Sequence, residues 1–345
     1  MKEIYFAGNF LSKRIEGTRA MYEEIAERLS RLGWSVVSAS SFKNRLLRMV
    51  DFLWTAWRYR QKYQIASVAV FSDLAFRWSE ILCLFLRMIH KPYILSLHGG
   101  KLPEFARNNP GRVKRLLTSA YIVTTPSKYI RESFLPIRDD MQYVPNGIEI
   151  KNYPFVKIKE AKPRLIWLRS FHEIYQPIFA VEVMAELIKE FPDASLQMIG
   201  PDKKDGSLEK TKITIDHYDL DNNIQIINAI SKAMVPKFLS EGSIFLNTTK
   251  YESFGVSVLE AAACGLCIVT TNAGELPYMW EDGVDALIVP VNDPEAMTTA
   301  VRRILTEPGL AEKLSRNARE KAEKYDWSVI FPQWEALFNN VIGYG

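Results

Sequence analysis

The chain has few cysteines, no long apolar run and little excess charge. Its 345 residues include three cysteines, which argues against a disulfide scaffold and for a reducing compartment such as the cytoplasm. The longest apolar stretch, residues 81–89, contains Arg87 and is shorter than the roughly 20 residues that span a bilayer. The first residues form too short an apolar run for a secretory signal peptide. We therefore expect a cytoplasmic protein whose membrane contact, if any, is peripheral and at the inner face.

The charge balance does not indicate a nucleic-acid-binding protein. Lysine and arginine number 44 and aspartate and glutamate 40, a net charge of +4, which is too small to draw the chain to a polyanion by itself. The hydrophobic fraction of 48% is that of an ordinary globular protein. A chain of 345 residues exceeds the roughly 250 to 300 at which one hydrophobic core stops growing, so we expect two domains.

The N-terminal half alternates short apolar runs with longer amphipathic ones. The runs typical of buried strands cover residues 4–7, 35–39, 67–71, 93–97 and 121–125. Between the first two, residues 18–32 carry apolar side chains at helical spacing, and Gly33 can end that helix. The alternation predicts a parallel sheet with helices on both faces.

The C-terminal half repeats this alternation. Its expected strands cover residues 165–168, 195–199, 224–227, 244–246 and 267–270, and its expected helices about 178–190, 232–239 and 256–264. Residues 148–163, rich in Lys, Pro and Glu, separate the halves. The predicted fold class is α/β, with two Rossmann-like, doubly wound parallel-sheet domains at residues 1–150 and 151–325 that face a ligand-binding cleft.

The last segment, residues 326–345, is predicted to form an apolar helix. It carries Trp327, Val329, Ile330, Trp334, Leu337, Phe338 and Val341. A helix with so many apolar side chains must be covered by something. We expect it to cross back and dock on the N-terminal domain, and an oligomer contact is the alternative.

Two of the cysteines lie in the sequence Cys264-Gly-Leu-Cys267. This spacing occurs in redox and zinc sites, but no second pair and no histidine lie nearby in the sequence. We expect both thiols to be buried without a chemical role, and we expect no metal site.

The most informative segment is residues 251–265. After a strand, a loop with Glu252 leads to a helix that has Gly255 in its first turn and Glu260 in its interior. The free N–H groups and the dipole of a helix N-terminus suit a phosphate. The two carboxylates would repel a diphosphate, so in a binding site they must face hydroxyls, and a carboxylate can accept two hydrogen bonds from a vicinal diol. The ordinary alternative is a pair of solvent-exposed glutamates.

This segment resembles the E-x7-E motif of the family 4 retaining glycosyltransferases, which have the glycosyltransferase type B (GT-B) fold. Glu252 and Glu260 are separated by seven residues, with Phe254-Gly255 between them. Further similar stretches are Leu97-His98-Gly99-Gly100, Thr125-Pro126-Ser127, Val144-Pro145-Asn146-Gly147-Ile148, Ile199-Gly200, Gly274-Glu275-Leu276-Pro277 and Asp293-Pro294-Glu295-Ala296. The resemblance covers nearly the whole chain and is tightest over residues 244–296.

The resemblance implies a hexosyltransferase that moves a sugar from a UDP- or GDP-linked donor to an acceptor hydroxyl with retention of configuration. It implies no tightly bound cofactor and no metal. By the motif, Glu260 holds the ribose hydroxyls and Glu252 the hydroxyls of the transferred sugar. Backbone N–H groups of Phe254, Gly255 and Val256 are expected to bind that sugar and the diphosphate. The leaving phosphate takes the proton of the acceptor, so no general base is assigned.

Five further positions take expected roles from the same resemblance. Arg169 matches the arginine that clamps the diphosphate, and the loss of such a group typically costs about 100 to 1,000-fold in rate. His98 is expected to contact the transferred sugar, and Gly17 to lie in a glycine loop near the phosphates. Backbone groups near Gly200 and Ile227 are expected to recognise the base.

One departure concerns a lysine that the family has five or six residues after the arginine. Ile174, Tyr175 and Gln176 occupy this region, and His172, Tyr175, Lys250 or a helix dipole could compensate. A sugar-nucleotide-binding protein without turnover is therefore a second hypothesis, and another GT-B enzyme such as a sugar-nucleotide epimerase is a third. Family usage favours surface polysaccharide or glycolipid biosynthesis, with a glycan or lipid-linked acceptor.

Residues 42–62 combine basic and aromatic side chains. The basic ones are Lys43, Arg45, Arg48, Arg58, Arg60 and Lys62, set against one acid, Asp51, with Phe52, Leu53, Trp54 and Trp57 interleaved. A helix with basic and aromatic faces suits an anionic membrane surface. The alternatives are a helix that covers the N-terminal sheet with a solvated basic face and, less favoured, RNA binding.

Overall fold

The computed structural model describes residues 2–8, 10, 21–42 and 44–343. The chain forms two compact units, of which the first comprises Met1–Asn146 with Ser328–Gly345 and the second Gly147–Trp327. Each unit contains one six-stranded parallel sheet and its own helices. The α/β fold class predicted from the sequence is therefore confirmed.

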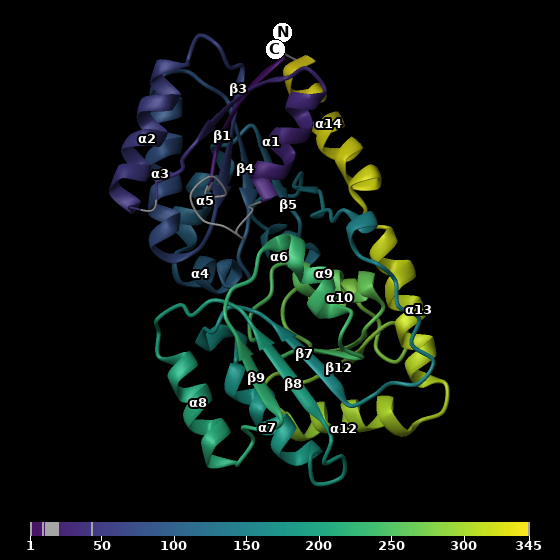
Figure 1. Ribbon diagram of the computed structural model, residues 1–345. Coiled ribbons are helices and arrows are strands. Elements are labelled where there is room, and N and C mark those ends of the chain that lie inside the picture. Colours follow the sequence, from purple (N-terminus) through teal and green to yellow (C-terminus); the bar gives the residue numbers. More distant parts are fainter. Residues whose placement is uncertain (1, 9, 11–20, 43, 344–345) are drawn as a thin grey trace. The chain divides into compact units, whose positions relative to one another are not determined.

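The N-terminal unit has the strand order β2-β1-β3-β4-β5-β6 (Figure 1). Its strands are β1 (Glu3–Ala7), β2 (Ser35–Ala39), β3 (Ile65–Val70), β4 (Tyr93–Leu97), β5 (Ile122–Thr125) and β6 (Gln142–Tyr143). All five residues of β4 are buried, as is typical of an inner strand of a parallel sheet that is covered on both faces.

The helices of this unit flank that sheet. They are α1 (Met21–Arg31), α2 (Arg45–Arg58), α3 (Asp73–Met88), α4 (Leu102–Asn108), α5 (Pro110–Thr118), α6 (Lys128–Phe134) and α14 (Trp327–Gly343). The side chain of Asn44 caps α2 by accepting hydrogen bonds from the N–H groups of Leu46 and Leu47. The basic segment predicted to be helical between residues 42 and 62 is thus helical only over α2.

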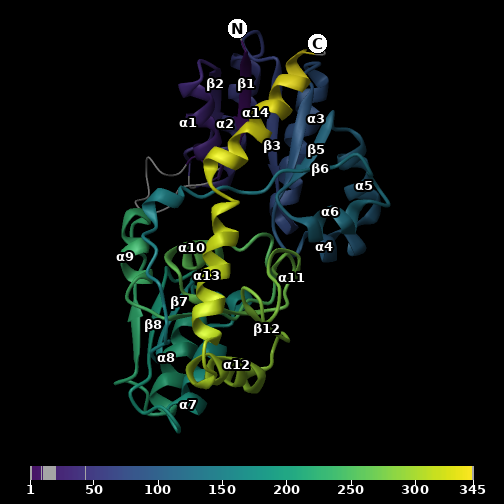
Figure 2. The same cartoon turned by 90° about the vertical axis from the view of Figure 1, so that its right-hand side faces the viewer.

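Helix α14, the end of the yellow ribbon in Figure 2, belongs to the N-terminal unit and packs on it through aromatic rings. Phe338 meets Phe6 edge to face with ring centroids 5.7 Å apart, and its centroid lies 6.1 Å from that of Trp34. Trp334 stacks on Phe338 at 5.8 Å. These contacts bury the side chains of Trp334 and Phe338 almost completely.

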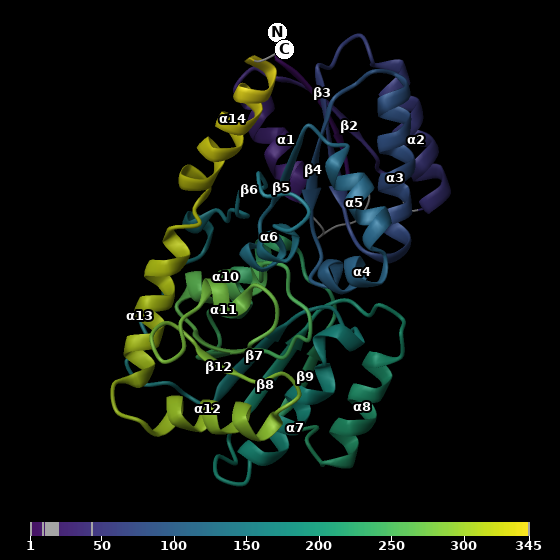
Figure 3. The ribbon, with the colours of Figure 1, turned by 180° about the vertical axis from the view of Figure 1, so that it is seen from behind.

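The C-terminal unit has the strand order β12-β11-β10-β7-β8-β9 (Figure 3). Its strands are β7 (Arg164–Leu168), β8 (Ser195–Ile199), β9 (Ile224–Ile227), β10 (Ile244–Asn247), β11 (Cys267–Thr271) and β12 (Leu287–Val289). Its helices are α7 (Pro177–Leu187), α8 (Ser207–His217), α9 (Val235–Leu239), α10 (Val256–Cys264), α11 (Leu276–Met279), α12 (Pro294–Thr306) and α13 (Leu310–Glu323).

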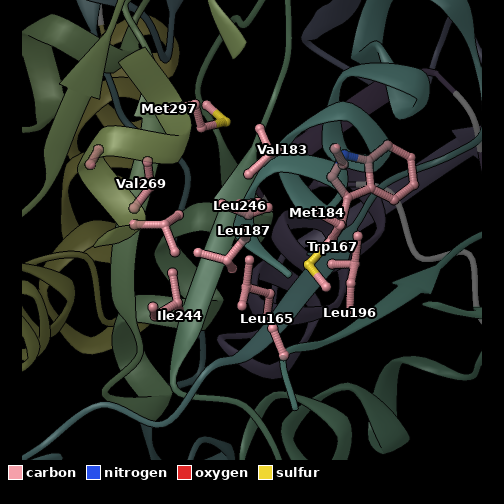
Figure 4. Packing of buried hydrophobic residues seen from close by; sticks show 14 of the residues in the cluster. Leu165, Trp167, Val183, Met184, Leu187, Leu196, Ile244, Leu246, Val269 and Met297 are labelled. Atoms are coloured by element: carbon pink, nitrogen blue, oxygen red, sulfur yellow. The ribbon is translucent and has the colours of Figure 1, made fainter. Parts of the chain in front are cut away.

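Two apolar cores lie on opposite faces of this second sheet. Along β7, Leu165 and Trp167 join the core that contains α7 and α12 (Figure 4), whereas Ile166 joins the core of α9, α10 and α13. This division follows from the alternation of side chains along a strand. The two cores fix the backbone of β7, and therefore the position of the residue that follows it.

Cys264 and Cys267 are divided between these same two cores. Both are free thiols, and burial raises the pKa of each to about 12. The prediction that they are buried is confirmed. Within the described residues, no helix is long and apolar enough to cross a bilayer.

Each sheet reverses its direction of winding at one pair of neighbouring strands. In the N-terminal unit the chain passes from β2 over β1 to β3, so the reversal lies between β1 and β3. In the C-terminal unit β7, β8 and β9 succeed one another outward, and β10 returns to the other side of β7. Ligands of open parallel sheets bind at the carboxyl ends of the strands at such reversals. We therefore expect ligand sites at these two places.

Candidate functional site

The β7/β10 reversal of the C-terminal unit carries an arginine paired with a glutamate. Arg169 directly follows β7, and its Nη2 donates to Glu252 Oε2 in the loop after β10. Both side chains are only about one-tenth exposed, at 11% and 10%. The structure thus brings together two residues that lie 83 positions apart and that the sequence analysis assigned to one site.

Arg169 is held in place by two further side chains. Its Nε and Nη2 donate to Asn247 Oδ1 at 3.2 and 3.1 Å, and Asn247 itself donates to Thr270 Oγ1 at 2.9 Å. The guanidinium also lies 5.3 Å from the centre of the Tyr175 ring. A planar cation fixed in this way keeps its position without a ligand. Less side-chain entropy is therefore lost when an anion binds.

The loop between β10 and α10 is folded tightly around Glu252. The second carboxylate oxygen, Oε1, accepts hydrogen bonds from the N–H groups of Ser253 and Phe254 at 3.1 and 3.3 Å. Gly274, with φ +55°, lies against the carbonyl of Glu252 so closely that a Cβ would overlap it. Only glycine can therefore occupy this neighbouring turn.

The N-terminus of α10 presents backbone N–H groups beside this loop. Gly255 precedes the helix with φ +91°, a conformation that glycine adopts without strain. It has no side chain to cap the first turn, whose N–H groups have no partner within the helix. Ser257 in that turn is buried, yet its Oγ makes no hydrogen bond to any described residue. Free donors at a helix N-terminus favour an anionic ligand.

Glu260 lies one turn further along α10 and is 3% exposed. Its Oε1 accepts a hydrogen bond from the Tyr153 hydroxyl at 2.7 Å and is paired with Lys232. Both bonds reach Oε1, so within the described part of the chain Oε2 remains available to a ligand. The side chain of Lys232 is 49% exposed, so its ammonium can turn to solvent where ligand hydroxyls take its place on the carboxylate.

Two predicted base-recognition residues lie at the ends of β8 and β9. The N–H of Gly200 donates to the carbonyl of Ile227 at 3.0 Å, and the N–H of Arg169 donates to the carbonyl of Ile199 at 3.0 Å. A Cβ on Gly200 would overlap the carbonyl oxygen of Arg169. Gly200 is therefore the residue that lets the chain after β8 approach the chain after β7.

The loop that lacks the expected lysine is tied to the loop after β10. Thr248 Oγ1 donates to the carbonyl of Tyr175 at 2.6 Å, and the N–H of Lys250 donates to the carbonyl of Ile174 at 2.8 Å. Nδ1 of His172 accepts from the N–H of Ile174 at 3.2 Å. Of the residues considered as substitutes for the lysine, Tyr175 is the one in ring contact with Arg169.

His98 belongs to the N-terminal unit, where it follows β4. Its ring stacks on Phe71 at 5.5 Å and meets Tyr22 edge to face at 6.1 Å. Burial lowers the pKa of His98 to about 4, so the imidazole is neutral at physiological pH. Gly17 lies outside the described residues.

Three residues of the site were not predicted from the sequence. Tyr153 and Lys232 contact Glu260 from positions 107 and 28 residues away, and Asn247 orients Arg169. Lys232 has no local pattern that marks it, whereas Asn247 directly follows the expected strand at residues 244–246, where site residues of parallel sheets gather. That position is the one signal that could have identified Asn247.

The sequence of this chain is similar to a known protein family and to a known mannosyltransferase. Residues 150–321 match the family described as Glycosyl transferases group 1. The phosphatidyl-myo-inositol mannosyltransferase of Mycolicibacterium smegmatis is 23% identical over 212 residues, which cover 60% of this chain and 53% of the relative. The chain thus spans about half the length of this mannosyltransferase.

Two solved structures share the fold over the whole chain. The sucrose-phosphate synthase from Thermosynechococcus elongatus superposes with a TM-score of 0.85 at 18% identity, covering 100% of both chains. Anabaena Alr3699/HepE in complex with UDP-glucose gives a TM-score of 0.81 at 14% identity, again with 100% coverage of both chains. At such identities the likeness concerns the fold.

Proposed function

We infer that this chain, a glycosyltransferase whose residues 150–321 match the group 1 family, moves a sugar from a nucleoside diphosphate sugar to an acceptor hydroxyl with retention of configuration. The observation that carries this proposal is the N-terminus of α10 with a carboxylate on either side, Glu252 held by Arg169 and Glu260 with a free oxygen. The N–H groups can donate hydrogen bonds to an anion, and the carboxylate on each side can accept them from a diol. This arrangement suits a diphosphate that links a ribose to a sugar.

The side chain of Glu260 and several backbone groups have proposed roles in donor binding. Oε2 of Glu260 accepts hydrogen bonds from the ribose hydroxyls, and backbone groups near Gly200 and Ile227 contact a uracil or guanine base. The backbone N–H groups of Phe254, Gly255 and Val256, at the start of α10, bind the sugar and the diphosphate. The UDP-glucose complex of Anabaena Alr3699/HepE has the same fold, which supports a UDP-linked donor.

The transfer step relies on charge that develops on the leaving phosphate. As the bond from the anomeric carbon to the phosphate oxygen breaks, Arg169 stabilises the charge on that oxygen from the position in which Asn247 and Glu252 hold it, and Glu252 accepts hydrogen bonds from the sugar hydroxyls. The acceptor oxygen bonds to the anomeric carbon on the same face, and its proton passes to the leaving phosphate. A fixed guanidinium stabilises this charge without reorganisation. His98 is proposed to contact the sugar, and Gly17 to lie near the phosphates.

Replacing Glu260 by glutamine tests the donor site directly. The amide oxygen can still accept from Tyr153, but the charge-assisted bonds to the ribose diol are lost, so donor affinity should fall about 10 to 100-fold. Calorimetric titration with UDP- and GDP-sugars measures this change. The control is Tyr153→Phe, which removes the hydroxyl partner and keeps the carboxylate. Unchanged affinity in Glu260→Gln would remove Glu260 from the site.

The N-terminal unit is proposed to bind an anionic membrane surface through α2 and α3. Large apolar side chains exposed by 39% or more on these helices and the turn between β3 and α3 are Leu46, Leu47, Val50, Trp54, Trp57, Phe71, Leu74, Ile81, Leu84 and Met88. Exposed apolar side chains that gather into one patch mark an interaction surface. The guanidinium of Arg60 lies 4.7 Å from the Trp57 ring, so cations and aromatic rings lie together as membrane interfaces favour. A lipid-linked acceptor in glycolipid or polysaccharide synthesis would suit this surface.

Charge reversal on α2 and the turn after it tests the membrane contact. Each basic residue near an anionic surface contributes about 1 kcal/mol, so changing Arg45, Arg48, Arg58 and Arg60 to Glu should lower binding to anionic vesicles at least tenfold at low salt. Co-sedimentation measures the bound fraction. The matched control changes the exposed lysines Lys189, Lys210, Lys212 and Lys324 to Glu. Equal pelleting of both variants, or pelleting insensitive to salt, would contradict the membrane contact. The exposed apolar side chains would then be expected to contact a second copy of the chain.

A further inference from the structure

The N-terminal unit contains a cavity of about 510 Å³ at the β1/β3 reversal. The sheet contributes Ala7, Val68 and Ala69 to its lining, and α2 and α3 contribute most of the rest. These two helices pack side by side over this part of the sheet (Figures 1 and 3). The size lies within the roughly 300 to 1,000 Å³ of small-molecule sites, and the place is where open parallel sheets bind ligands.

The interior of this cavity is mostly apolar. Its larger apolar side chains are those of Met49, Phe52, Phe71, Leu74, Trp78 and Leu82. The hydroxyls in the lining already have acceptors, since Ser79 Oγ donates to the carbonyl of Ala69 at 3.2 Å and Ser72 Oγ to Asp73 Oδ2 at 2.8 Å. A sugar or a base placed here would lose hydrogen bonds to water without replacement, which is unfavourable. A hydrocarbon chain loses none.

Two arginines from the first turns of α2 complete the lining. Arg48 donates from Nε to the carbonyl of Phe42 at 2.9 Å, which fixes its guanidinium. Burial, together with the charge of Arg45, lowers the pKa of Arg48. An anion bound between the two guanidiniums would relieve this repulsion. Asp73 is the carboxylate of the lining, and it is engaged by Ser72.

We propose that this cavity binds a phosphate-headed anionic lipid, with a hydrocarbon chain among the apolar side chains and the phosphate between Arg45 and Arg48. The exposed Leu74 and Phe71 belong both to the cavity lining and to the apolar outer surface of the unit. A lipid chain can therefore pass from a membrane surface into the cavity without crossing a polar barrier.

The cavity also borders one of the predicted site residues. Phe71 of the lining stacks on the ring of His98 at 5.5 Å. In the proposed transferase, the lipid held here would be the acceptor. That role rests on the proposed function, whereas binding of the lipid does not.

Calorimetry with a short-chain lipid tests this site apart from any bilayer. The full-length protein is titrated with dihexanoyl phosphatidic acid below its critical micelle concentration, and with dihexanoyl phosphatidylcholine and inorganic phosphate as comparisons. One phosphatidic acid should bind per chain, and each comparison ligand at least tenfold more weakly. Ala75→Phe, which places a ring in the cavity lining, should lower the affinity at least tenfold. Ile81→Phe, on the exposed side of the same helix, should change it less than twofold.

A fluorescence measurement keeps the test decisive if Ala75→Phe does not fold. A phosphatidic acid with a brominated chain should quench Trp78, and Trp78→Phe should lose most of this quenching, whereas Trp54→Phe should keep it. Equal affinity of Ala75→Phe and the parent, or quenching insensitive to Trp78→Phe, would overturn the proposal. If the protein binds the lipid but cleaves no donor, the lipid site is supported and the proposed function is contradicted.

Discussion

Replacing Arg169 by alanine is expected to lower the turnover of donor about 100 to 1,000-fold, because the developing charge on the leaving phosphate loses a fixed cation. The donor dissociation constant should change much less, since the charge on the diphosphate grows as the glycosidic bond breaks. Steady-state rates of donor hydrolysis together with calorimetric affinities separate the two effects. The hydrogen bonds of Arg169 to Asn247 and Glu252 hold the guanidinium in one position, and the proposed function places the leaving phosphate beside it.

Two controls belong to this prediction. Arg302→Ala removes an exposed arginine that is paired with Glu190 in the same unit, and it should leave the rate unchanged. Arg169→Lys keeps the charge but not the fork that binds Asn247 and Glu252 together, so it should restore only part of the rate. A rate for Arg169→Ala within twofold of the parent would show that the positive charge comes from elsewhere.

Replacing Gly200 by alanine is expected to destabilise the C-terminal unit by about 3 kcal/mol or more, the range reached when a core contact is overpacked and the backbone strained. The added Cβ would overlap the carbonyl oxygen of Arg169, which is backbone and cannot rotate away. Urea unfolding followed by circular dichroism measures the free energy of unfolding.

The matched control for this prediction is Gly206→Ala. Gly206 also has a positive φ, +85°, but nothing lies within 4 Å of its Cβ position. It should cost only the roughly 1 to 2 kcal/mol of the left-handed conformation. Equal losses in the two variants would mean that the contact between Gly200 and Arg169 has no special importance.

Most strands could be predicted from the sequence because apolar, β-branched runs mark them locally. Helix α3 was not predicted, and its composition explains why. Phe76, Leu82 and Leu86 are buried on it at helical spacing, but Leu74, Ile81, Leu84 and Met88 are exposed, so apolar residues outside the buried face obscure the 3.6-residue period in the sequence. Residues 81–89, read as a merely apolar stretch, mostly belong to this helix.

The resemblance located Glu252, Glu260 and Arg169, but the contacts that these residues make come from the topology. Glu252 meets Arg169 because β10 returns beside β7, a strand order that local patterns do not encode. The contacts of Glu260 with Tyr153 and Lys232 likewise join segments that are distant in the sequence, because Tyr153 follows the short 3-10 helix Ile150–Asn152 and Lys232 begins another, Lys232–Met234. The roles given to these residues, and to His98, remain predictions.

Cleavage of a nucleoside diphosphate sugar with retention is tested most directly by proton NMR of the released sugar. The full-length protein is incubated with UDP- and GDP-sugars of defined anomeric configuration, and the first anomer released into water is recorded before mutarotation. We expect at least one donor to release its sugar with the anomeric configuration of that donor. Release of the opposite anomer would contradict the retaining mechanism, and donor binding without any release would make the chain a sugar-nucleotide-binding protein.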